Sequence, residues 1–370
     1  MRHRIAIVTS TAPALLSRPT ILAIETSCDE TAAAVITGEG RIASSVLCSQ
    51  HDVHTRYGGV VPELAARRHI ETVEVIATEA VRKAGMVWTD VQAVAVTQGP
   101  GLAGALLVGV SFGKALAYAL RVPLIGVNHL EGHIASAWMD QPDFPVPCVA
   151  LVVSGGHTHL YLVRSDSTLQ LLGKTIDDAA GEAFDKAATI LGLGFPGGPA
   201  IDRLARTGCA TTVKFPRPYL KPGSLDFSFS GLKTALLYHW RDRGQPVEQK
   251  AVADVAASYQ EAIVDVLVEK AFRAVRRHHV HALAVVGGVS ANSRLRALLA
   301  TRTSAAGIRL AMPASALCTD NAAMIAAAGL RAYRQGRLAS WDLEASADLL
   351  LPTTADPQSL PVRTAATRRM

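Results

Sequence analysis

A short apolar stretch, a tight polar turn and a second apolar stretch occur in that order twice in this chain. The two copies occupy residues 21–37, around the turn TSCDET, and residues 149–163, around the turn SGGHT. Apolar runs of this length, bounded by turn residues, predict paired β-strands. Each copy is followed later by a strand that enters a glycine turn before a helix, at residues 98–104 and 287–292. The pattern predicts a duplicated α/β lobe with a ligand between the copies.

The composition of these turns indicates what kind of ligand they hold. Small hydroxyl side chains, glycines and successive backbone N–H groups allow an anion to approach the chain closely. Actin-like and sugar-kinase folds hold a phosphate with such strand–turn–strand units. We therefore predict an α/β protein with a two-lobed, actin-like or sugar-kinase-like (ASKHA) fold, in which duplicated mixed β-sheets carry flanking helices.

The length of the chain predicts two domains, because 370 residues exceed the size at which one core keeps growing. The proline-rich stretch 141–147, QPDFPVP, is the natural boundary between them. The expected parts are a disordered N-terminal extension at 1–20, a first lobe at 21–140, a second lobe at 148–318, a final helix at about 319–336 that packs back near the site, and a C-terminal tail at 341–370.

Two helices are expected in the first lobe. One begins at Pro62 and ends before Gly85, and its predicted apolar face consists of Ile70, Val73, Ala77, Ala80 and Val81. The other, at residues 101–120, is nearly as apolar as a membrane span. It carries Lys114 near its centre and lies between strand-like segments, so a buried core helix is the better interpretation. We expect a protein that has no membrane contact and works in the cytoplasm.

The cysteines and the net charge indicate the compartment and the type of partner. The five cysteines form no C-x-x-C pair and leave one over, which is typical of a reducing compartment. The net charge of +6 is compatible with a polyanionic partner such as a nucleic acid. The basic residues are scattered along the chain, and a solvated surface explains each cluster as well as a nucleic-acid contact does.

The stretch VNHLEGHIAS contains the strongest candidate for chemistry. His129 and His133 are four residues apart, so on a helix both imidazoles lie on one face and can bind one metal ion. Asn128 is placed to cap this helix, and Glu131, three residues later, completes a capping-box pattern. Two histidines alone do not make a metal site, so a third ligand has to come from elsewhere in the chain.

Asp320 is the best candidate for that third ligand. It follows a predicted strand and precedes a predicted helix, which is the usual position of active-site groups in open α/β folds. An acid at the start of a helix is explained equally well by its interaction with the helix dipole. Two imidazoles and one carboxylate suit Fe²⁺ and Zn²⁺ about equally.

Three functions could use a histidine pair or phosphate-binding turns of this kind, and the residues argue against each of them. A zinc peptidase would have glutamate directly after the first histidine, as in H-E-x-x-H, whereas this chain has Leu130 there and Glu131 one position later. A kinase or ATPase would fit the phosphate turns, but such enzymes usually hold Mg²⁺ through carboxylates and phosphates. A catalytically silent scaffold would need neither the histidines nor the glycine turns.

Many ordered motifs of this chain resemble one family. The motifs are ETSCDET, HTRYGGVVPELAARRHIE, GPGLAGALLVG, VNHLEGHIAS, VVSGGHTHLY, TIDDAAGEAFDKAA, FPGGPAID, FSFSGLKTA, GGVSAN and CTDNAAMIA. With these motifs, from residue 21 to about residue 329, the chain is similar to the tRNA N6-adenosine threonylcarbamoyltransferases, formerly described as O-sialoglycoprotein endopeptidases. One departure is His159, where a glutamine is expected.

The resemblance implies roles for particular residues. The metal ligands fall on His129, His133 and Asp320. The resemblance implies Fe²⁺ as the bound ion, with Zn²⁺ as the alternative. Asp29 and Glu30, in the first turn, are candidates to orient or deprotonate the attacking amine. The residues expected to contact the substrate nucleotide are Val152, Val153, Ser154, Gly155, Gly156, Asp185, Gly198, Asp202 and Asn292.

The implied reaction moves a threonylcarbamoyl group from threonylcarbamoyl-AMP to N6 of the adenosine 3′ to the anticodon, in tRNAs that read codons starting with A. This reaction needs orientation of a weak nucleophile and stabilisation of an oxyanion. The partners implied are tRNA, threonylcarbamoyl-AMP, a smaller inactive paralogue subunit and an ATPase subunit.

Overall fold

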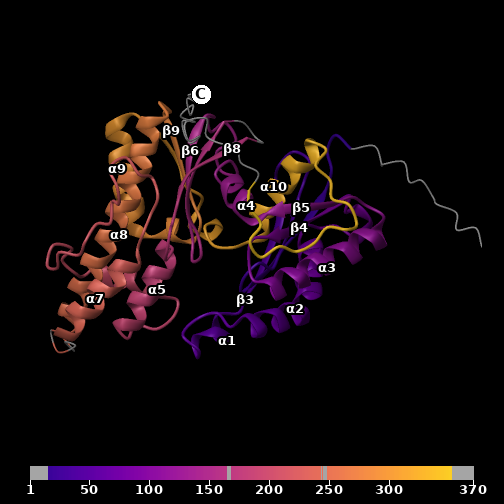
Figure 1. The fold of residues 1–370 in the computed structure, drawn as a ribbon. Coiled ribbons are helices and arrows are strands. Elements are labelled where there is room, and N and C mark those ends of the chain that lie inside the picture. Colours follow the sequence, from indigo (N-terminus) through magenta and orange to yellow (C-terminus); the bar gives the residue numbers. More distant parts are fainter. Residues whose placement is uncertain (1–15, 165–167, 243, 245–247, 352–370) are drawn as a thin grey trace, which may run out of the picture.

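Two five-stranded mixed β-sheets form the framework of the molecule in a computed structural model (Figure 1). The structure describes residues 16–164, 168–242, 244 and 248–351. The predicted fold class, two duplicated sheet lobes with flanking helices, is confirmed within these residues.

The two sheets have the same topology. Across the sheet, the first has the strand order β3-β2-β1-β4-β5 and the second β10-β9-β6-β7-β8. Along the chain, each sheet begins with an antiparallel meander of three strands and continues with two parallel strands. The strands of the first sheet are β1 Ile21–Glu25, β2 Glu30–Ile36, β3 Ile42–Ser49, β4 Ala93–Gly99 and β5 Leu124–Asn128. Those of the second are β6 Cys148–Val153, β7 Thr158–Val163, β8 Leu169–Lys174, β9 Ala282–Val286 and β10 Arg309–Ala311.

Helices fill the connections between the strands. The α-helices are α1 His51–Thr55, α2 Pro62–Lys83, α3 Ala103–Leu120, α4 His129–Ser136, α5 Ala180–Ile190, α6 Gly197–Ala205, α7 Ser230–Asp242, α8 Gln249–Arg277, α9 Ser293–Ala306 and α10 Ala322–Arg334. Short 3-10 turns lie at Trp88–Asp90, Gly288–Ala291 and Ser315–Leu317.

The first sheet is covered on both faces. Alternate residues of a strand point to opposite faces, so Leu22 and Ile24 pack against α2 and α3, whereas Ile21 and Ala23 pack against α10. Because α10 follows the second sheet in sequence, the chain crosses back to the first lobe to complete this layer (Figure 1). The predicted apolar face of α2 is buried except for Ile70, whose exposed fraction is 66%.

The second sheet has α5 to α9 on one face. Its other face packs on Leu130 and Ile134 of α4 and on Phe144 of the proline-rich connector. Ala135, also on α4, packs against the core of the first sheet. The short helix α4 is therefore held between the two sheets, which fixes its position relative to both lobes.

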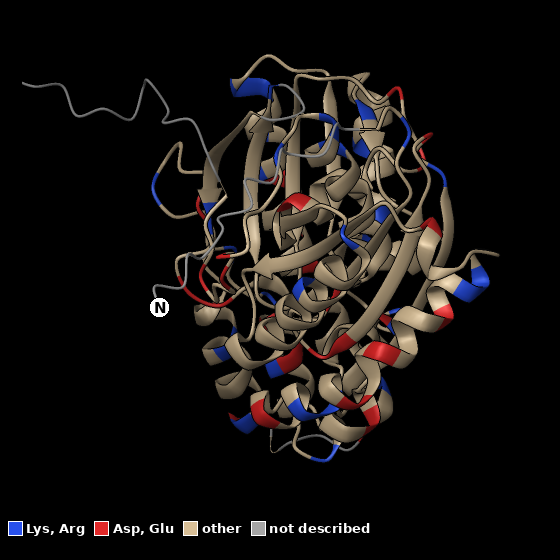
Figure 2. Ribbon diagram, turned by 90° about the vertical axis from the view of Figure 1, so that its right-hand side faces the viewer, with Lys and Arg blue, Asp and Glu red and all other residues tan. Residues whose placement is uncertain are grey.

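Helix α3 is the described helix that is long and apolar enough, by length and composition, to cross a membrane. In the structure it packs along α2 and β4, and Leu106, Val110 and Ala117 are buried in the core of the first lobe. These contacts are those of a core helix. On the face shown in Figure 2, Lys and Arg are interspersed with Asp and Glu, so the positive charge is not gathered in one patch there.

The two end segments of the described chain pass beside the first lobe, and the last described residue, Leu351, packs in the core between α4 and the second sheet. Leu16 donates its backbone N–H to the hydroxyl of Tyr333 (3.0 Å). Residues 338–351 run across the ends of β4 and β5, where Ser346 N bonds Gln98 O (2.9 Å) and Gly101 N bonds Ala347 O (3.0 Å). Residues 1–15 of the predicted extension and 352–370 of the predicted tail lie outside the described residues.

Candidate active site

Three side chains from distant parts of the chain meet at the junction of the two lobes. His129 and His133 lie one turn apart on α4, and Asp320 lies just before α10, which packs against α4. Oδ1 of Asp320 is 3.1 Å from Nε2 of His133 and 3.4 Å from Nε2 of His129. Both histidines are buried, and the Asp320 side chain is 23% exposed. The structure thus brings together the three predicted ligands.

The N-terminus of α4 is held as predicted by Asn128, but not by Glu131. Oδ1 of Asn128 accepts hydrogen bonds from the backbone N–H groups of Leu130 (2.9 Å) and Glu131 (3.4 Å). The carboxylate of Glu131 instead pairs with Arg337 (2.6 Å), so the expected capping box is only half formed. Arg337 carries a full positive charge, which attracts the carboxylate more strongly than the partial charge of a backbone N–H does.

The pKa values of His129, His133 and Asp320 are shifted in different directions. Burial disfavours a charge on His129, but Asp320 and Glu25 outweigh it and raise its pKa to about 10. Burial, together with the positive charge on His129, lowers the pKa of His133. Burial alone would keep Asp320 protonated, yet the two imidazoles hold its pKa well below its usual value. The metal-free chain therefore keeps a proton on His129, which a bound cation would release.

The donor set fits a divalent metal ion. Metal–ligand bonds of about 2.0–2.2 Å separate neighbouring ligands by roughly 3–3.5 Å, close to the two distances measured here. One potential ligand atom from each residue lies within 4.8 Å of the others. Three protein ligands leave further coordination positions open, as catalytic metal sites do. The residues thus suit a catalytic metal, with Fe²⁺ and Zn²⁺ both compatible.

Asp29 and Glu30 form a second group with His51. Their potential ligand atoms also lie within 4.8 Å of one another. Ser49 donates its hydroxyl to Oε1 of Glu30 (2.9 Å), whereas Oε2 of Glu30 is buried and has no hydrogen-bond partner among the described residues. Burial raises the pKa of Glu30 to about 7, and the negative charges of Asp29 and Asp320 add to the rise. A carboxylate with this pKa can accept a proton near neutral pH.

Replacing Glu30 by glutamine should change the pH dependence of stability. The folded chain holds the proton on Glu30 up to about pH 7, and the unfolded chain only to about pH 4.5, so the wild type loses stability between these values. Glu30→Gln should remove that loss, and the metal-free variant should be more stable than the wild type by about 2–3 kcal/mol at pH 8. Urea unfolding at pH 5 and pH 8 measures this. A difference that is the same at both pH values would contradict the raised pKa.

The predicted nucleotide strip lies at the end of β6. The side chains of Val152 and Val153 are fully buried, and Gly155 and Gly156 are exposed, with nothing within 4 Å of a Cβ added to either glycine. Ser154 closes the turn with hydrogen bonds between its backbone N–H and His157 O (2.8 Å) and between its hydroxyl and His157 N (3.2 Å). What this strip offers to a ligand is its backbone.

The other predicted substrate residues also lie in the second lobe. Asp185 on α5 accepts a hydrogen bond from Gly197 N (2.7 Å), next to Gly198 at the start of α6. Burial raises the pKa of Asp185, and the charge of Asp29 in the first lobe contributes, so the two lobes face each other here.

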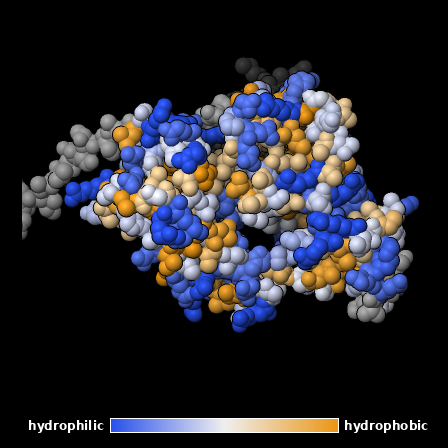
Figure 3. All heavy atoms as spheres, turned by 180° about the vertical axis from the view of Figure 1, so that it is seen from behind, coloured by the Kyte–Doolittle hydropathy of each residue, from blue (hydrophilic) through white to orange (hydrophobic). Residues whose placement is uncertain are grey.

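Asp202 and Asn292 also have protein partners for their side chains. Oδ1 of Asp202 accepts hydrogen bonds from the backbone and the hydroxyl of Ser293 (3.1 and 2.7 Å). Asn292 caps α9 and donates to Oε1 of Gln260 (2.7 Å). Both side chains therefore organise the turn after β9. Seen from behind, the surface is hollowed between the two lobes (Figure 3).

Glu25 was not among the residues predicted from the sequence. Its side chain is 0% exposed, and Oε2 lies 3.1 Å from Nδ1 of His129. The available signal was a charged residue at the carboxyl end of the otherwise apolar strand ILAIE, where active-site groups of parallel strands gather.

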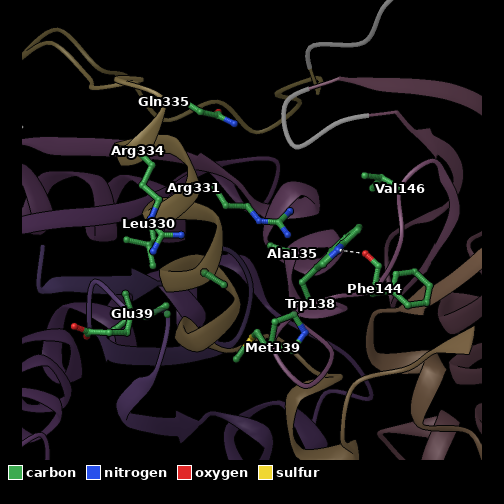
Figure 4. Close-up of a pocket in the computed structure, with 14 residues that line it drawn as sticks. Glu39, Ala135, Trp138, Met139, Phe144, Val146, Leu330, Arg331, Arg334 and Gln335 are labelled. Carbon is green, nitrogen blue, oxygen red and sulfur yellow. Dashed lines mark hydrogen bonds between the residues drawn. The ribbon is translucent and has the colours of Figure 1, made fainter. Parts of the chain in front are cut away.

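A separate cavity of about 470 Å³ lies on another face of α4 (Figure 4). Trp138 and Phe144 line it together with Arg331 and Arg334 of α10, and the guanidinium of Arg331 lies 4.6 Å from the Trp138 ring centre. None of its lining residues is a predicted ligand or substrate contact. This cavity is therefore distinct from the candidate site.

The geometry does not support the peptidase alternative. Leu130, at the position where a zincin has its glutamate, is buried against the second sheet. Glu131 points to Arg337. Neither residue places a carboxylate next to the histidine pair for activation of a water molecule.

The repeated sheet topology and the cluster between the lobes define an actin-like (ASKHA) two-lobed protein with a candidate metal centre. Solved structures share this fold: the crystal structure of T. kodakarensis HypF superposes with a TM-score of 0.58 at 15% identity, covering 89% of this chain and 50% of that one. The family model for tRNA N6-adenosine threonylcarbamoyltransferase matches residues 41–327. The chain belongs to this family.

The chain aligns with nearly the whole length of its sequence relatives. The tRNA N6-adenosine threonylcarbamoyltransferase of Anaeromyxobacter sp. (strain Fw109-5) is 55% identical over 326 residues, which are 88% of this chain and 98% of the relative. The enzyme of the same name from Moorella thermoacetica is 50% identical over 340 residues, which are 91% of this chain and 98% of the relative. The sequence-based family assignment is confirmed.

Proposed function

We propose that this protein transfers the threonylcarbamoyl group from threonylcarbamoyl-AMP to N6 of the adenosine 3′ to the anticodon, in tRNAs that read codons starting with A. Family membership over most of the chain carries this proposal. The buried His–His–Asp cluster at the lobe junction supports it, because it provides a metal site without the geometry of a peptidase. Its substrate places the reaction in the cytoplasm.

The donor is a mixed anhydride, so its leaving group is already activated and the protein needs no nucleophile of its own. The N6 lone pair attacks the carbamoyl carbon, the bond from that carbon to the phosphate oxygen breaks, and AMP leaves. The proton from N6 has to pass to a base. We assign this role to Glu30, with Asp29 orienting the amine, because Glu30 has an unpartnered buried oxygen and a pKa of about 7.

The adenylate is expected to lie along the second lobe. Backbone groups at Ser154, Gly155 and Gly156 hold the phosphate, and Val152 and Val153 support that strip from below. Asp185, Gly198, Asp202 and Asn292 are expected around the ribose and the base. A divalent ion, Fe²⁺ by family and Zn²⁺ as the alternative, would be bound by His129, His133 and Asp320, and supplies Lewis-acid stabilisation of negative charge on substrate oxygen.

The protein is expected to act with partners. The family implies a smaller inactive paralogue subunit and an ATPase subunit beside tRNA. The decisive experiment supplies synthetic threonylcarbamoyl-AMP and unmodified tRNA to the purified chain with these partners. Mass spectrometry of the tRNA nucleosides should show threonylcarbamoylated adenosine only when the chain is present.

Two outcomes would contradict the proposal. An unmodified tRNA, with all partners and donor present and the chain folded, would reject the transferase. Stoichiometric ATP turnover by the chain alone, without tRNA, would instead favour the kinase or ATPase alternative.

A further inference from the structure

Glu25 stands out among the buried charged residues because it lies directly behind a proposed metal ligand. It ends β1, Thr97 lies near the end of the adjacent β4, and His129 follows the end of β5. The three strands are parallel neighbours, with Ile24 opposite Val96 and Thr97 opposite Val127. Parallel strands end at the same edge of a sheet, so the topology brings these three side chains together.

The Glu25 carboxylate has three hydrogen-bond partners among the described residues. Oε2 accepts from the Thr97 hydroxyl (2.8 Å) and lies 3.1 Å from Nδ1 of His129, and Oε1 accepts from the backbone N–H of Ser27. A carboxylate can accept at both oxygens, whereas an amide would turn its N–H₂ group toward one of these partners. A glutamine at this position would therefore lose at least one of these hydrogen bonds.

Nδ1 of His129 has two neighbours, Oε2 of Glu25 (3.1 Å) and the hydroxyl of Ser27 (3.1 Å), and the carboxylate of Glu25 can only accept a hydrogen bond from it. If Nδ1 carries a proton and donates it to Glu25, Nε2 is left as a lone-pair donor, and Nε2 is the atom that faces Asp320. Metal-binding histidines commonly donate their second nitrogen in this way, which fixes the ring and raises its basicity. The other histidine lacks this support, since Nδ1 of His133 is buried with no hydrogen-bond partner among the described residues.

We propose that Glu25 is a positioning residue for the metal. It holds His129 with its proton on Nδ1 and Nε2 directed at the ion. The inference rests on the metal site of the proposed function. It extends that site to a carboxylate that does not touch the ion itself.

The test measures metal affinity without tRNA or donor. Zn²⁺ is titrated into the metal-free chain in competition with a chromophoric chelator at fixed pH. Glu25→Gln should weaken Zn²⁺ binding by about 10–100-fold. The matched control is Glu131→Gln, which removes the same charge on α4 itself, where the carboxylate contacts Arg337 and not a histidine. The control should bind Zn²⁺ within about twofold of the wild type.

Equal Zn²⁺ affinities of Glu25→Gln and Glu131→Gln would overturn the inference. If Glu25→Gln does not fold, nitrogen-15 NMR of the histidines in the zinc-loaded wild type decides. A protonated Nδ1 and a metal-bound Nε2 on His129 are expected, and metal on Nδ1 would reject the role of Glu25. A wild type that binds no Zn²⁺ would reject both this inference and the metal site, whereas the tRNA assay tests the transfer reaction separately.

Discussion

His133→Ala should reduce the rate of tRNA modification by at least about a hundredfold, because it removes one of the three metal ligands. The side chain is fully buried and its Nε2 lies 3.1 Å from Oδ1 of Asp320, and an alanine side chain offers no ligand atom at this place. The measurement is single-turnover transfer from synthetic threonylcarbamoyl-AMP to unmodified tRNA with the partner proteins present. Metal analysis of the same preparation should show a parallel loss of the bound ion.

His159→Gln is the matched control for this experiment. His159 lies on β7, and its Nδ1 pairs with the Tyr161 hydroxyl (2.9 Å) and not with the cluster. Glutamine can replace that hydrogen bond, and transfer should stay within a few-fold of the wild type. Asp320→Ala should lower metal content as His133→Ala does. Equal activity of His133→Ala and the wild type would reject the metal site.

Gly287→Ala should both destabilise the protein and weaken binding of the adenylate. Gly287 follows β9 with φ +94°, and an added Cβ would lie 2.3 Å from the carbonyl oxygen of Val153, in the predicted nucleotide strip. The positive φ and the displacement of that carbonyl should together cost about 2–4 kcal/mol. Urea unfolding measures the first effect, and titration with a non-hydrolysable threonylcarbamoyl-AMP analogue measures the second.

Gly307→Ala is the control that separates the steric clash of the added Cβ from the strain of a positive φ. Gly307 ends α9 with φ +63°, and nothing lies within 4 Å of its added Cβ. It should cost only about 1 kcal/mol and leave adenylate binding unchanged. If Gly287→Ala were no more harmful than Gly307→Ala, the close packing of the β9 turn on the nucleotide strip would not matter for either stability or binding.

Much of the fold could be predicted from local patterns. The two strand–turn–strand copies are short-range features, since each strand is a run of apolar residues bounded by turn residues. The start of α2 at Pro62 and of α4 after Asn128 follow from local capping chemistry. The five-residue helix α1 is too short to show a periodic pattern, so no local signal predicts it.

Other features depended on contacts between distant residues. Ile70 fits the apolar face of α2 by its spacing, yet it is exposed because the neighbouring layer does not reach it. Glu131 has the spacing of a capping box, but Arg337, 206 residues later, binds its carboxylate. Spacing shows which side chains share a face and not what lies opposite that face.

The candidate site shows the same division. The amino-acid sequence determined that His129 and His133 share one helical face, that glycine turns follow the strands, and to which family the chain belongs. Only the tertiary structure decided that Asp320, 187 residues after His133, meets both imidazoles, and that Glu25 lies behind His129. The physical reason is that parallel strands bring their carboxyl ends to one edge and α10 returns to the first lobe, and both effects depend on sheet order, which no local pattern of residues contains.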